Sequence, residues 1–169
     1  MNRASTDKPG VPVLGAEHVA FLAGAAISSA LAARDASNRP SVAKALAVRV
    51  RPGEPAVEVF VDGDRAFELL RDLRAGSPVA LVCSEPKSHR TIQVKGRRGD
   101  IVPLAAGDDA FVASRVDAIV AHIVPLGYHD AALRAYFAFA PASLLKVVFT
   151  ATAAFLQTPG PGAGAPLKA

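Results

Sequence analysis

Hydrophobic and polar positions alternate along several short stretches of this chain, and other stretches repeat with the spacing of a helix. The stretches that predict strands are residues 26–34, 41–50, 56–61, 78–84, 89–97 (or on to 102) and 144–156. The stretches that predict helices are residues 15–24, 64–75 and 108–123, with another helical turn or two within 129–139. Hairpin-length links join most of the strands. The pattern therefore predicts a mainly β fold, an antiparallel barrel with peripheral helices, and disfavours a parallel Rossmann sheet.

Proline and glycine mark the two ends of this predicted barrel. Residues 1–14 contain Pro9, Gly10 and Pro12, and we interpret them as a flexible N-terminal arm before a domain at 15–157. Residues 158–169 form a Pro/Gly-rich tail that cannot be regular structure. Its turn chemistry and the apolar Leu167 favour docking on the domain surface; a floppy tail is the alternative.

Composition indicates a globular chain with a thin core. Hydrophobic residues make up 51% of the sequence, but only 6% is aromatic and much of the rest is Ala and Val, which bury little area each. A partner subunit could complete such a core, so we expect an oligomer. The single cysteine, Cys83, lies in an apolar run and is expected to fill the core. No membrane span is evident, and a cytoplasmic location is expected.

The chain lacks the common motifs of catalysis and metal binding. We find no GxGxxG, GxxxxGK[ST], HExxH, CxxC or GxSxG pattern. The histidines show no metal-ligand spacing, and no metal site is predicted; they are His18, His89, His122 and His129. Any chemistry is therefore expected to come from a bound cofactor. The net charge of +4 fits a phosphorylated ligand, nucleic acid, or simply a mildly basic protein.

Lys44 is the first residue that suggests a ligand. Simple alternation along residues 41–50 places it on one face with Val42, Leu46, Val48 and Val50, where an unpaired ammonium would be costly. Three explanations stay open: the strand bulges, the lysine snorkels to solvent, or an anion meets it. The opposite face is small: Ser41, Ala43, Ala45, Ala47 and Arg49. It would admit a flat ligand or pack tightly against a helix.

A basic segment, residues 87–98, is the second candidate. It contains five Lys or Arg residues and no acid. Alternation places His89, Thr91, Gln93 and Lys95 on one face, and Arg90 on the other. Such donors and acceptors could read a heteroaromatic ring and hold a phosphate. The alternatives are a solvated barrel exterior and, less favoured for want of interleaved aromatic residues, a nucleic-acid surface.

Three segments, in this order, resemble the pyridoxamine 5′-phosphate oxidase-like family of FMN-binding split β-barrels, and in particular a bacterial branch of it. They are residues 34–42, 82–86 with 89–96, and 155–162. The similarity covers roughly residues 15–165. It implies an antiparallel split barrel, an FMN cofactor, and a homodimer with the cofactor site at the subunit interface. It also implies that the tail at 158–169 docks near that site.

The resemblance assigns cofactor contacts to particular positions. Lys44 falls where the family has a basic residue that reaches the FMN phosphate, and Arg49 at the spacing of a lysine near the substrate. Phe60, Val61 and Arg65 loosely match positions that contact the ribityl chain and the phosphate.

Further contacts are implied by the last two segments. Thr91 or Gln93 is the counterpart of a glutamine that contacts the isoalloxazine ring, and His89 and Arg90 flank it. Gln157 and Thr158 are similar to the terminal segment with which the partner subunit closes the flavin site.

The chain also departs from the family. Residues 159–164 replace a substrate-gripping Arg-x-His motif, and Leu156 stands where a tryptophan is expected. The resemblance therefore supports an FMN-dependent oxidoreductase of unknown substrate and does not extend to oxidation of pyridoxamine 5′-phosphate. The alternative is a non-catalytic split barrel that binds flavin or haem. No side chain is singled out as catalytic.

Overall fold

The computed structural model describes residues 13–167, and nearly every predicted element is present in it. The strands are β1 (Ser28–Arg34), β2 (Pro40–Val50), β3 (Ala56–Asp62), β4 (Val79–Ser84), β5 (Thr91–Gly96), β6 (Asp100–Val102), β7 (Leu144–Thr150) and β8 (Ala153–Leu156). The helices are α1 (Ala16–Leu22), α2 (Phe67–Arg74), α3 (Asp108–Ile123) and α4 (Asp130–Phe137). The strand predicted at 89–97 is β5, and its possible extension to 102 is a separate strand, β6. The segment 144–156, expected to contain the last strand, contains two, β7 and β8.

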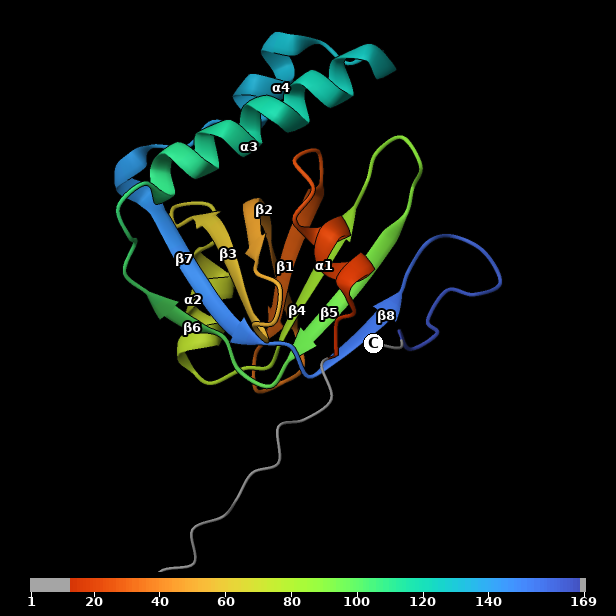
Figure 1. Cartoon of the computed structure of the whole chain (residues 1–169). Helices are drawn as coiled ribbons and strands as arrows, with labels where there is room; N and C mark the ends of the chain where they lie inside the picture. The colour runs from red at the N-terminus through yellow and green to blue at the C-terminus, as the bar shows by residue number, and fades with distance from the viewer. Residues whose placement is uncertain (1–12, 168–169) are drawn as a thin grey trace, which may run out of the picture.

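All eight strands form one antiparallel sheet in the order β6-β7-β3-β2-β1-β4-β5-β8, which confirms the predicted architecture. The sheet curls into a barrel, so that strands far apart in this order approach one another (Figure 1). Gly96 on β5 marks such an approach, because a β-carbon there would lie 2.5 Å from a ring carbon of Phe149 on β7.

A β-bulge in β2 overturns the simple alternation predicted for this strand. The register with β3 shifts between Ala45 and Ala47. Before the bulge, the small face turns inward, and Ser41 donates a hydrogen bond to Asp72 on α2. Val48, which follows the bulge, is buried as predicted. Val42, which precedes it, is 64% exposed. The prediction that Val42 and Lys44 share a packed face with Val48 was therefore wrong, and the bulge is the reason.

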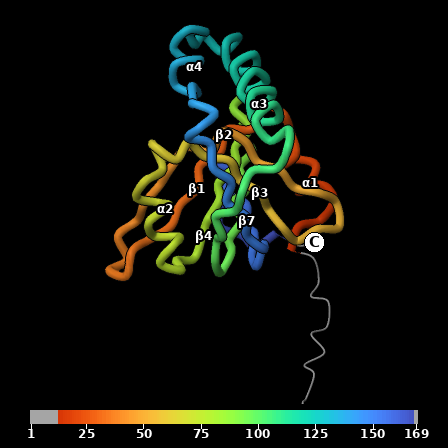
Figure 2. The backbone as a smooth tube through the Cα atoms, turned by 90° about the vertical axis from the view of Figure 1, so that its left-hand side faces the viewer, coloured from red at the N-terminus to blue at the C-terminus, as the bar shows by residue number. Residues whose placement is uncertain are grey.

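The helices cover different parts of the barrel. Leu69, Leu70 and Leu73 of α2 pack into the main core, which Leu22 of α1 also joins. Cys83 lies in this core and is fully buried, as expected. Helices α3 and α4 lie across one end of the barrel, with α1 and α2 on opposite sides below them (Figures 1 and 2). No helix within residues 13–167 combines the length and the apolar character needed to cross a bilayer.

Both ends of the described chain contact the barrel. Val13 and Leu14, the described part of the predicted arm, pack against the main core; residues 1–12 lie outside the described residues. The tail turns back along β8, where Gly164 donates a backbone hydrogen bond to Leu156 and Leu167 donates one to Ala154. Backbone pairing thus orders a segment whose sequence forbids longer strands.

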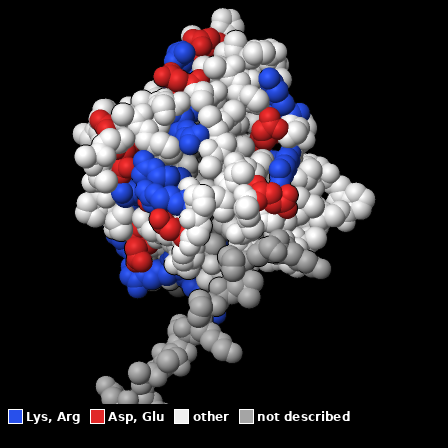
Figure 3. Space-filling view, in the orientation of Figure 1, with Lys and Arg blue, Asp and Glu red and all other residues white. Residues whose placement is uncertain are grey.

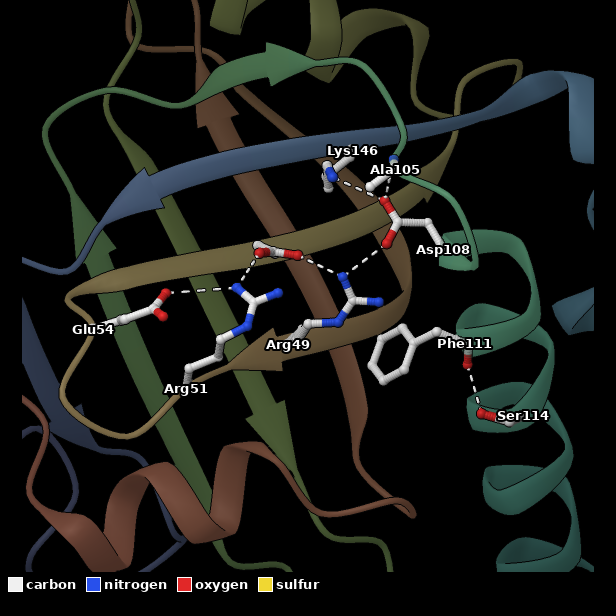
Figure 4. A network of polar contacts seen from close by, with 9 residues as sticks. Arg49, Arg51, Glu54, Ala105, Asp108, Phe111, Ser114 and Lys146 are labelled. Carbon is white, nitrogen blue, oxygen red and sulfur yellow. Dashed lines mark hydrogen bonds and ion pairs between the residues drawn. The ribbon is translucent and has the colours of Figure 1, made fainter.

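A network of buried charges connects α3 to the barrel (Figure 4). The carboxylate of Asp108, in the first turn of α3, is 2% exposed. It accepts hydrogen bonds of 2.8 Å each from Lys146 on β7 and Arg49 on β2, and one from the backbone of Ala105. Burial alone would raise the pKa of Asp108, but these donors outweigh it and lower the pKa to about 2.

We expect Asp108→Asn to destabilise the fold by about 3–5 kcal/mol, because it leaves the buried ammonium of Lys146 without a carboxylate partner, whereas Arg49 keeps its 2.8 Å contact with Glu58. Urea unfolding measures the change. The matched control is Asp109→Asn, the exposed neighbour in the same helical turn, which should stay within about 0.5 kcal/mol of the parent protein.

The same network predicts how stability depends on pH. Because the folded pKa of Asp108 lies below its unfolded value, its contribution is present above about pH 4 and is lost as the pH falls towards 2. Equal acid sensitivity of the parent protein and Asp108→Asn would contradict this role for Asp108.

Candidate functional site

A cleft of about 440 Å³ opens between the end of the barrel and the α3–α4 segment. Its barrel side comes from the ends of β1, β4, β5 and β8, and its other side from the end of α3 through α4. The lining residues are Ser28, Ser84, Glu85, Pro86, His89, Thr91, Ile123, Leu126, Tyr128, Leu133, Tyr136, Phe137, Gln157 and Pro159. Its volume falls within the range of small-molecule and cofactor sites.

Hydroxyl groups form a row along the barrel side of this cleft. Ser28 on β1 lies opposite Ser84 on β4 in the strand register, and Ser84 lies opposite Thr91 on β5. The Ser84 and Thr91 hydroxyl oxygens are 2.8 Å apart and share a hydrogen bond. The row thus crosses three neighbouring strands and presents donors and acceptors to the cleft.

Lys44 extends this row onto β2. Its Nζ donates a 2.8 Å hydrogen bond to the Ser28 hydroxyl and lies 5.0 Å from the centre of the Phe137 ring. Both of these residues line the cleft. Burial lowers the pKa of Lys44 to about 8, and no carboxylate among residues 13–167 pairs with its ammonium group. The bulge explains why the lysine turns this way, and its environment is that of a cation ready to meet an anion.

The predicted segment at the end of β8 closes one side of the cleft. The backbone N–H of Gln157 donates a hydrogen bond to the backbone carbonyl of Thr91. The backbone N–H of Thr91 in turn donates to the hydroxyl of Thr158, with an N–O distance of 3.0 Å. Gln157 and Pro159 line the cleft. His89 lines it too, with a φ of 57°, a left-handed conformation that histidine tolerates better than most residues.

Arg65 supports the helical side of the cleft. Its guanidinium donates a 2.9 Å hydrogen bond to the backbone carbonyl of Tyr136, at the end of α4. The ring of Tyr136 stands edge-on to that of Phe137, with 5.0 Å between their centres. Arg65 therefore fixes the position of two lining residues without lining the cleft itself.

The structure places the remaining predicted residues away from the cleft lining. Arg49 belongs to the Asp108 network, with its guanidinium 4.1 Å from the Phe111 ring centre. Val61 is fully buried in the main core, and Phe60 is fully buried against α3. Arg90 stacks on the ring of Phe21, 4.8 Å from its centre. Gln93, half-buried on β5, lies between Val82 and Phe155 in the strand register.

The sequence pattern does not predict the helical side of the cleft. Helices were predicted at 108–123 and 129–139, but nothing in their spacing indicated that Leu133, Tyr136 and Phe137 face a ligand site. Glu85 was also missed, although it stands beside the basic segment in the sequence. The signal available for Glu85 was its place at a strand end, followed by Pro86, where functional side chains often lie.

A second cavity of about 400 Å³ lies between α2 and the β1–β2 turn. Its two arginines already have partners: Arg71 pairs with Asp72 at 2.9 Å, and Arg34 donates to the side-chain oxygen of Asn38. We therefore take the cleft beneath α3–α4 as the candidate site.

Three solved structures share this fold. A candidate pyridoxamine 5′-phosphate oxidase from Lactobacillus delbrueckii superposes with a TM-score of 0.53 at 16% identity, over 87% of this chain and 97% of that one. An F420 reductase superposes with a TM-score of 0.51 at 21% identity, over 80% of this chain and 93% of that one. HupZ of Group A Streptococcus superposes with a TM-score of 0.53 at 10% identity, over 89% of this chain and 100% of that one.

The chain therefore has the split-barrel fold of the pyridoxamine 5′-phosphate oxidase-like proteins, as its sequence predicts. No family model and no curated protein matches the sequence. At these identities the comparisons establish the fold, and the ligand has to be argued from the residues of the cleft.

The thiol of Cys83, beneath the cleft, should be unreactive in the native protein. Burial raises its pKa to about 12, so on the order of 10⁻⁴ of it is thiolate at pH 8. We expect a dithiobis-nitrobenzoate assay to detect no thiol in native protein and one per chain in urea. Rapid labelling of the native protein would show that this part of the core opens.

Proposed function

We propose that this chain binds FMN in the cleft beneath α3–α4 and acts as an FMN-dependent oxidoreductase. The observation that carries this proposal is the row of hydroxyl groups that ends at Lys44, a half-buried cation with no carboxylate partner in residues 13–167. A phosphate supplies the negative charge that this ammonium lacks, and hydroxyl groups suit the polar chain attached to it.

The other residues of the cleft fit the rest of the cofactor. Phe137 and the aliphatic side chains of the α3–α4 segment suit a flat ring system, while Thr91 and Gln157 offer hydrogen bonds to its edge. FMN supplies hydride or electron transfer when it is bound. The chain supplies charge compensation, orientation and a partly apolar environment; we assign no side chain as acid or base.

We further propose that the protein is a homodimer with this site at the subunit interface. Val42 and Phe67 are large apolar side chains with 64% and 67% exposure, which a second copy could cover. Val42 precedes Lys44 by two positions on the same strand. A subunit that covers Val42 would therefore border Lys44. Light scattering of the purified protein tests this arrangement.

Haem binding is the second candidate, and one residue favours it. His89 lines the cleft, and a neutral imidazole can ligate haem iron. In that case the split barrel would be a non-catalytic binding protein. An absorption spectrum separates the two candidates, because flavin and haem have different bands.

We expect Lys44→Glu to weaken FMN binding at least tenfold, because it replaces the proposed phosphate partner with a like charge. FMN retention after gel filtration, read at about 450 nm, measures the effect. The control is Lys95→Glu, which makes the same charge change at an exposed position on β5 and should retain FMN as the parent does.

The pH dependence gives an independent check on the same residue. FMN affinity should fall as the pH rises above about 8, because Lys44 then loses its proton.

Equal FMN retention by Lys44→Glu and Lys95→Glu would contradict the phosphate assignment. A protein that ignores FMN altogether would contradict the proposed function itself.

A further inference from the structure

The charge that lines the candidate cleft is negative. Of the fourteen residues that line it, Glu85 is the one Asp, Glu, Lys or Arg. Lys44 lies behind Ser28 and Phe137 rather than in the lining itself. A phosphate at Lys44 accounts for the cation but leaves the carboxylate of Glu85 without a role. The cleft therefore presents a second recognition element.

Glu85 is held in place by its neighbours. The hydroxyl and the backbone N–H of Ser88 both donate to its Oε2 atom. Led by the Ser88 hydroxyl, these contacts lower the pKa of Glu85, so the group is ionised at neutral pH. Its Oε1 atom is left free of these bonds and lies 3.1 Å from Nε2 of His122, near the end of α3.

The contact between Glu85 and His122 is incomplete. Nε2 of His122 is buried, and although it lies close to Glu85 Oε1, no hydrogen bond of acceptable geometry forms to it within residues 13–167. The pair becomes an ion pair only when His122 carries a proton. The Oε1 atom of Glu85 therefore has no well-formed hydrogen bond from His122, and it remains available to a ligand.

Aromatic rings surround the same opening. Tyr128 and Tyr136 line the cleft and are 61% and 58% exposed, large values for tyrosine side chains on a small domain. The face of an aromatic ring attracts cations, and organic ammonium groups are held by rings of this kind together with a carboxylate. An anionic substrate would instead be repelled by Glu85.

We infer that the substrate of this cleft carries a cationic nitrogen, an organic ammonium or a similar group, and that Glu85 with Tyr128 and Tyr136 recognises it. The inference rests on the proposed function in placing the cofactor phosphate at Lys44. The site would then carry two charges of opposite sign, Lys44 for the anionic cofactor and Glu85 for the cationic substrate. Glu85 acts in specificity, and His122 is a positioning residue behind it.

The test compares two probes of similar shape, benzylammonium and neutral benzyl alcohol, on the purified protein with FMN added. We expect the ammonium probe to bind roughly tenfold more tightly, as measured by ligand-observed NMR titration. Glu85→Gln should remove this preference and leave the affinity for benzyl alcohol unchanged. The matched control is Glu68→Gln, an exposed position on α2, which should keep the preference.

Two results would overturn the inference. One is equal binding of both probes by the parent protein. This measurement uses no variant, so it does not depend on whether Glu85→Gln folds. The other is a folded Glu85→Gln protein that keeps the preference, which would leave Glu85 with a structural role at His122. FMN retention is read on the same samples. If Glu85→Gln loses the ammonium preference, the inference about the substrate is supported, even where FMN does not bind. If the parent protein retains FMN but binds both probes equally, the inference about the substrate is refuted and the proposed FMN binding is not.

Discussion

The carboxylate of Asp108 is the interaction on which the arrangement of this protein depends. Helix α3 has to lie across an open end of the barrel, and its first turn is fastened there by Lys146 and Arg49 from two different strands. Taking three charges out of water is costly, and their mutual hydrogen bonds offset that cost only while all partners are present. Because the far end of α3 forms a wall of the cleft, this buried network at one end of the helix also determines the shape of the site.

A single extra residue in β2 has a comparable effect on the other side of the cleft. Without the bulge, strict alternation along residues 41–50 would give Lys44 the same face as Val48, which is buried in the core. The bulge instead directs the lysine towards Ser28, and exposes Val42. The lysine is then buried enough to have a lowered pKa but remains close to the cleft. Bulges often redirect a side chain near functional sites in this way.

The sequence predicted the elements well because the information for them is local. Periodicity identifies β4 and α2, and Gly76 with Pro78 ends the helix. It did not predict which way Lys44 points, since no glycine marks the bulge. The contact of Arg49 with Asp108 joins residues 59 positions apart, and no local pattern reports it. The tail was predictable only in part: its prolines and glycines exclude long strands, but its return along β8 depends on an unpaired strand edge that exists only in the folded sheet.

The two charges at the cleft belong to different structural units, and this separation has a physical consequence. Lys44 is fixed by the sheet, through Ser28, whereas Glu85 lies in the β4–β5 turn and touches α3 through His122. The surroundings of Glu85, Tyr128 and Tyr136 therefore depend on where α3 and α4 lie, and Lys44 also contacts this segment at the Phe137 ring. The strand register alone sets the hydroxyl row, whereas the surroundings of both charges depend on the packing of α3 and α4, which the buried carboxylate of Asp108 fastens to the barrel.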